Sequence, residues 1–93
     1  MAVVQNVEKH IEHTEGFEVR ILHLTGRDVR SDRSGLPQYP FFNPCEGNMT
    51  VESWKSFRFR RAYPGFEVDV LDSQGHTAHG NMKLNTVRET YVQ

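Results

Sequence analysis

Two pairs of histidines share one spacing and are the first residues in this chain that could carry chemistry. His10 stands three positions before His13, and His76 stands three positions before His79. Imidazoles three residues apart lie on one face of a helix and can share a zinc ion, whereas in a strand they point to opposite faces. Both pairs fall in segments predicted as strands, and no cysteine or carboxylate is spaced to complete a site. We therefore predict no metal site, and a small metal-dependent enzyme is only a remote alternative.

Basic residues gather in two segments of a chain in which eight arginines outnumber three lysines. A guanidinium group meets phosphates, carboxylates and aromatic faces through a planar fork of donors. The two segments could therefore bind an anion or a nucleic acid, with Trp54, Phe59 or Tyr63 available to stack on bases. The candidate residues are Arg27, Arg30 and Arg33 in a loop, and Lys55, Arg58, Arg60 and Arg61 in a predicted helix.

Internal ion pairing is the alternative for these arginines, and we favour it. Helical periodicity places Arg58 and Arg61 near the inner face of their helix, where they could pair with Glu18, Glu67 or Asp69. The formal net charge is −1, so no overall field draws the chain to nucleic acid. Nucleic acid is thus a partner that the sequence allows but does not favour.

Motifs of enzyme active sites are absent from the sequence. Glu67 and Asp69 share one face of a predicted strand, but this is the outward face of any half-buried strand, without a pocket to raise a pKa. Cys45 and the serines stand in no nucleophile motif, and no glycine run has the spacing of a phosphate loop. We predict no catalytic residue and no cofactor, and favour a protein that is not an enzyme.

One helix is predicted over residues 51–62. Thr50 can cap its first free N–H groups, and Pro64 with Gly65 ends it. One arc of this helix is apolar and can cover a sheet, and it carries Val51, Trp54, Phe57 and Ala62.

Strands and turns are predicted for most of the remaining chain. Residues 17–21 and 66–71 alternate apolar and polar side chains, and short returning strands follow Gly26 and Gly75. Residues 3–13 fit either a helix or a strand, and we favour the strand. Residues 84–92, rich in threonine and valine, are predicted as a closing strand.

An internal repeat links the two strand segments. Gly16–Leu22 with Gly26 recurs 49 residues later as Gly65–Leu71 with Gly75. The repeat predicts two similar strand-turn units that lie side by side or are related by a pseudo-twofold axis. Chance similarity is the alternative, because many strands begin with a glycine followed by alternating residues.

These elements predict an α+β fold in one domain, residues 1–93. A small antiparallel sheet of four to five strands, made of two hairpins, would be packed by the helix at about 51–62. A content of 37% hydrophobic residues suffices for one core of this size. The predicted core residues are Phe17, Val19, Ile21, Trp54, Phe57, Phe66, Val68 and Val70.

An aromatic loop over residues 34–47 is the predicted interaction surface. Its three prolines prevent long regular structure, while Tyr39, Phe41 and Phe42 supply aromatic rings. Such a loop can cover a sheet edge or form a dimer contact. We therefore predict a non-catalytic interaction module that acts as a homodimer, with another protein or a small ligand as further partners.

The N-terminal residues show neither a basic region nor an apolar core of a signal peptide, and no apolar run approaches membrane length. A single cysteine, Cys45, fits a reducing compartment. We expect a cytoplasmic protein without a membrane partner.

Three stretches resemble small uncharacterised bacterial proteins, some of them of the kind carried by integrons and other mobile gene cassettes. These stretches are Met49–Lys55, Tyr63–Leu71 and Lys83–Tyr91. The resemblance implies a bacterial cytoplasmic setting, one compact domain and self-association, and it implies no active site.

Overall fold

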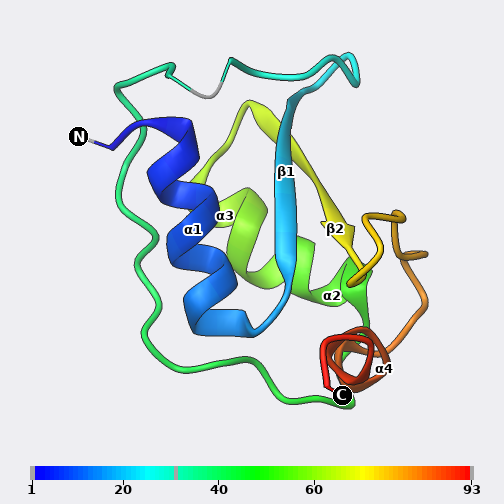
Figure 1. The fold of residues 1–93 in the computed structure, drawn as a ribbon. Coiled ribbons are helices and arrows are strands. Elements are labelled where there is room, and N and C mark those ends of the chain that lie inside the picture. Colours follow the sequence, from blue (N-terminus) through cyan, green and yellow to red (C-terminus); the bar gives the residue numbers. More distant parts are fainter. Residues whose placement is uncertain (1, 31, 93) are drawn as a thin grey trace.

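One two-stranded antiparallel sheet, flanked by helices, forms the centre of the α+β fold in the computed structural model, which describes residues 2–30 and 32–92 (Figure 1). Strand β1 (Glu18–His23) pairs with β2 (Phe66–Leu71). Helix α1 (Val4–Glu15) precedes β1, and α4 (Leu84–Glu89) follows β2. Between the strands, α2 (Val51–Trp54), a π-helical turn (Lys55–Phe59) and α3 (Arg60–Ala62) follow one another without a break.

Helix α1 replaces the strand predicted for residues 3–13, and that prediction was wrong. Its buried side chains are Val4, Val7, Ile11 and Glu15, at intervals of three and four residues. This spacing puts them on one helical stripe. Gly16 ends the helix in the left-handed region, with φ of 85° and its N–H donating to the Glu12 carbonyl.

The helix predicted over residues 51–62 is confirmed at both ends. Thr50 Oγ accepts the N–H of Ser53 at 3.2 Å. The π-helical turn adds a residue to one turn in the middle of this helix, which changes which side chains face inward. Phe59 is fully buried. Phe57 was predicted in the core, but it is 59% exposed, so that prediction was wrong.

The sheet has two strands, not the four to five of two full hairpins that we predicted, and the prediction was wrong. Each expected returning strand is a single bridge, Leu22 with Asp28 and Leu71 with Thr77. Only one buried apolar residue follows each turn, Val29 or Ala78, which is too little to hold a longer strand. Residues 84–92 were predicted as a closing strand, but α4 (Leu84–Glu89) forms in this segment.

The internal repeat is a structural repeat. In the first half, His23 N–H donates to Arg27, Gly26 N–H to His23 and Val29 N–H to Ile21; the same three backbone bonds recur 49 residues later, from Asp72, Gly75 and Ala78 to His76, Asp72 and Val70. In the sheet, Arg20 lies opposite Asp69, its own counterpart in the repeat. The two helix-strand-turn halves are therefore related by a pseudo-twofold axis at this pair.

The core lies between the sheet and the helices. The four central apolar strand residues, Val19, Ile21, Val68 and Val70, are all buried. Phe17 packs edge-on against Trp54, with ring centroids 5.2 Å apart. Among the residues that the structure describes, no helix has the length and apolar character to cross a membrane.

Candidate functional site

The three aromatic residues predicted as an interaction surface differ in how deeply they are buried. Tyr39 is 1% exposed, Phe41 is partly buried and Phe42 is 83% exposed. The Tyr39 hydroxyl donates to Glu15 Oε2 at 2.6 Å and accepts from Trp54 Nε1 at 3.2 Å. Tyr39 therefore belongs to the core, and Phe42 is the one of these three aromatic residues whose side chain is largely exposed.

A buried carboxylate, Glu15, holds several distant segments together. Besides Tyr39, it accepts hydrogen bonds from Arg58 at 2.6 Å, from Arg88 at 3.3 Å and from the Cys45 N–H at 2.9 Å. Burial and the nearby Glu15 carboxylate raise the pKa of Tyr39, so its phenol stays protonated and donates. Burial also raises the pKa of the Cys45 thiol. A buried carboxylate with this many hydrogen-bond donors has its polar atoms fully satisfied and links the segments that supply them.

Glu15 was missed in the sequence because residues 3–13 were assigned to a strand. On the helix that actually forms, Glu15 continues the stripe of Val4, Val7 and Ile11. A carboxylate on the apolar stripe of a helix is the signal that would have predicted a buried ionic partner.

Arg58 connects this buried cluster to the surface. Its guanidinium carbon lies 4.4 Å from the centre of the Phe41 ring, and its Nη1 donates to the Asn43 carbonyl. Phe42 lies between these two contacts in the chain, and Phe57 directly precedes Arg58. We call Phe41, Phe42, Phe57 and Arg58 the aromatic surface.

Of the four basic helix residues predicted as part of an anion site, two form ion pairs within the protein. Arg58 pairs with Glu15, and Arg60 pairs with Glu52 and, at 3.1 Å, with Glu67. Internal ion pairing was the favoured prediction, although the partners differ: Arg58 binds none of the three expected carboxylates, and Arg60 rather than Arg61 binds Glu67. Lys55 and Arg61, on the same helix, form no ion pair among the described residues.

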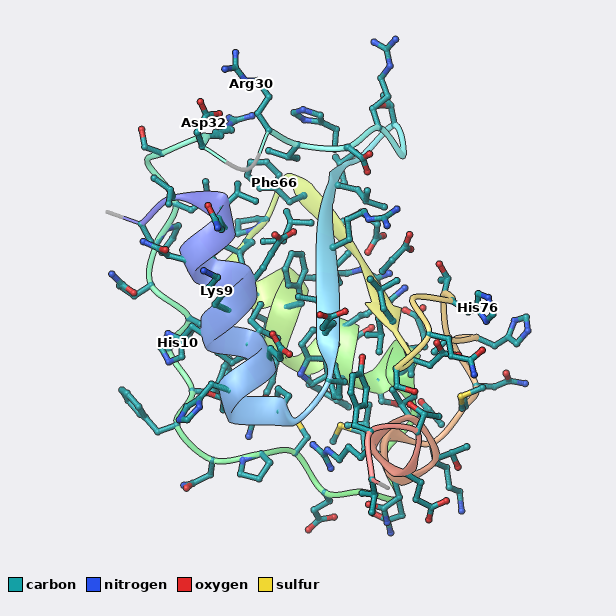
Figure 2. All side chains as sticks on the ribbon, viewed as in Figure 1. Lys9, His10, Arg30, Asp32, Phe66 and His76 are labelled. Carbon is teal, nitrogen blue, oxygen red and sulfur yellow. The ribbon has the colours of Figure 1, made fainter. Side chains whose placement is uncertain are left out.

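The loop arginines lie at one end of the sheet. Arg30 pairs with Asp32 at 3.1 Å, and Figure 2 shows both near Phe66 at the same end of the molecule. The Arg33 guanidinium carbon lies 5.0 Å from the centre of the Phe66 ring, and the His23 ring lies 6.2 Å from it.

Two adjoining hollows surround this group. A hollow of about 420 Å³, here called the loop hollow, is lined by His23, Val29, Arg30, Asp32, Arg33 and Ser34. A second of about 230 Å³, the apolar hollow, shares Arg33 and Ser34 and is also lined by Leu36, Ala62, Tyr63 and Phe66. Within residues 2–30 and 32–92, Tyr63 carries the one buried side-chain polar atom without a hydrogen-bond partner, its hydroxyl.

The two histidine pairs belong neither to the aromatic surface nor to the lining of the two hollows. His10 and His13 lie on α1, not on a strand, and His10 meets the Tyr39 ring edge-on at 5.8 Å. His76 and His79 lie exposed in the turn region after β2. In the part of the chain that the structure describes, no three histidine, cysteine or acidic side chains are grouped to hold a metal ion.

Comparison of the chain with protein-family models, with curated proteins and with solved structures finds no match.

Proposed function

We propose that this protein is a non-catalytic interaction module that acts as a homodimer through the aromatic surface. The observation that supports this most directly is Phe42, a large apolar side chain that is 83% exposed although the residues on both sides of it are held. An aromatic side chain on a rigid backbone loses little conformational entropy on binding, and aromatic anchors contribute strongly to interfaces.

One arginine holds the residues on both sides of Phe42. Arg58 lies over Phe41, and its Nη1 donates both to the Asn43 carbonyl and to Glu15 Oε2. Phe57, which directly precedes Arg58 in the chain, is a second large apolar side chain that is exposed, at 59%. A net charge of −1 gives two copies of the chain little mutual repulsion, which is compatible with a second copy as the partner.

The sheet edge supports self-association less well than the aromatic surface. The Ile21 N–H on the outer side of β1 already donates to Glu8 Oε2 of α1 at 2.8 Å. With this N–H already paired, the β1 edge is a less open template for another strand, and we place the dimer contact on the aromatic surface.

A nucleic-acid surface is less well supported. Arg58 and Arg60, two of the four basic residues of the helix, are engaged by carboxylates.

The single cysteine and the resemblance to bacterial cassette proteins support a bacterial cytoplasmic setting for the module.

The test is the mass of the protein in solution by light scattering. We expect a dimer whose mass does not depend on salt, and we expect the double variant Phe42→Ser, Phe57→Ser to be a folded monomer. Leu24→Ser is the matched control, because Leu24 is 70% exposed and lies outside the aromatic surface. A monomeric wild type, or a double variant that remains dimeric, would disprove the proposal.

A further inference from the structure

Arg33 is a cation without a carboxylate partner among the described residues, although its neighbour Arg30 has one in Asp32. Its guanidinium lies over the Phe66 ring and lines both the loop hollow and the apolar hollow. Arginine meets carboxylates and phosphates with two parallel donors. Arg33 is therefore placed to receive an anionic group from either hollow.

The backbone around Arg33 is anchored, so the side chain starts from a fixed position. The Arg33 carbonyl accepts the N–H of Val4 at the start of α1, at 2.8 Å. Three residues further on, Leu36 and Ala2 exchange two backbone hydrogen bonds. A preorganised cation binds a ligand at a lower entropic cost than one on a free loop.

The apolar hollow offers a complementary environment next to this cation. Leu36, Ala62, Pro64 and Phe66 give it apolar walls, and the buried Tyr63 has a hydroxyl that lacks a partner. Buried hydroxyl groups in proteins nearly always have a hydrogen-bond partner. The Tyr63 hydroxyl is enclosed by protein, so we assign no ligand contact to it, and the apolar walls are the part of this hollow that receives a ligand.

We propose that the loop hollow and the apolar hollow together bind a small organic anion with a flat apolar body. Its carboxylate or phosphate binds Arg33, with Arg30 adding positive charge against the single carboxylate of Asp32 in the lining. Its body lies against Phe66 in the apolar hollow. The site shares no residue with the aromatic surface, so ligand binding and dimer formation can be tested independently of each other.

The experiment is a titration of the full chain with phenyl phosphate and with benzoate, followed by amide chemical shifts in ¹H–¹⁵N spectra. We expect saturable shifts at His23, Arg33, Ser34 and Phe66 with at least one of the two probes. The stronger of the two identifies phosphate or carboxylate as the preferred head group. Inorganic phosphate and benzyl alcohol, which each carry only half of the ligand, are expected to bind at least about tenfold more weakly.

Arg33→Gln and Arg27→Gln form the matched pair of variants, because Arg27 is an exposed arginine of the same loop that lines neither hollow. Arg33→Gln is expected to weaken the preferred probe at least about tenfold, and Arg27→Gln to leave it within about twofold.

Three results would overturn the proposal. The first is the absence of saturable shifts at millimolar concentration of both probes, and the second is equal loss in Arg27→Gln and Arg33→Gln. The third is a salt-sensitive complex with a short single-stranded oligonucleotide that is weakened alike by both variants, which would assign the loop to nucleic acid instead.

Discussion

Glu15 shows at the scale of one residue how this small chain holds its extended middle segment. Through Tyr39, Cys45, Arg58 and Arg88, one carboxylate joins the end of α1 to the loop, the π-helical turn and α4. Each donor is partly or fully buried, so the loss of the negative charge would leave two arginines without their counter-ion.

We expect Glu15→Gln to lower the free energy of unfolding by about 3–5 kcal/mol, the usual effect of removing one partner of a buried ion pair. Urea unfolding measures this. Glu12→Gln, an exposed carboxylate on the same helix, is the control and should change stability by less than about 0.5 kcal/mol. Equal effects of the two substitutions would show that Glu15 is not the central contact.

The two buried tyrosines predict opposite effects of one chemical change. Tyr39→Phe removes a donor to Glu15 and should lower stability by about 1 kcal/mol or more, whereas Tyr63→Phe removes an unpartnered hydroxyl and should raise stability by about 1 kcal/mol. Thermal or urea unfolding of the two variants side by side tests the sign. A loss of stability in Tyr63→Phe would mean that its hydroxyl has a partner in solution.

At the scale of elements, α1 protects the edge of β1 through Glu8. Burial raises the pKa of this carboxyl above 4.5, against the opposing effect of the hydrogen bond from Ile21. The folded protein therefore holds the Glu8 proton more tightly than the unfolded chain, and stability falls as the pH rises above about 4.5.

Glu8→Gln should remove this part of the pH dependence while keeping an acceptor for Ile21. We expect the variant to gain stability relative to the wild type as the pH rises from 4 to 7. Unfolding curves at several pH values measure the difference, and a constant difference would contradict the raised pKa.

How far the elements could be predicted depended on whether their signals are local. The helix over residues 51–62 carries its cap and its stop in the sequence, at Thr50 and at Pro64, so both ends were predicted correctly. The π-helical turn has no such local signal, and it moved Phe57 out of the core. The propensity of threonine and valine predicted a strand after Leu84, but packing of Leu84 and Val87 into the core produced α4.

The candidate sites were predictable only in their residue types. Arg33 and Phe42 were singled out by their chemistry alone, whereas their surroundings come from long-range contacts with Phe66 and Arg58. Glu15 was hidden because its value as a buried partner depends on four segments that meet only in the folded chain.

At the scale of the whole molecule, the pseudo-twofold axis organises the chain. The loops of the two halves carry matched positions with different chemistry, since His76, His79 and Met82 stand where the first half has Arg27, Arg30 and Arg33. The symmetric backbone thus presents a basic loop in one half and a histidine-containing loop in the other, which is why only the first half carries the proposed anion site.

We expect the pair at the axis to tolerate an exchange of charges. Arg20→Asp alone sets two aspartates opposite each other and should lower stability by about 0.2–1 kcal/mol, whereas Arg20→Asp with Asp69→Arg should recover it. A double-mutant cycle measures the coupling. Additive losses in the double variant would show that the two side chains do not interact across the sheet.

The Arg20–Asp69 pair also bears on the descent of the protein. If a half-length ancestor assembled as a dimer about the same axis, this position would face its own copy and could hold no opposite charge. An arginine opposite an aspartate can arise once the two halves are encoded separately, as in one fused gene, where each site mutates alone. The charge at the axis would then date from after the fusion, and an ancestral half-length protein rebuilt with either charge in both copies should assemble less well than one with an uncharged residue there.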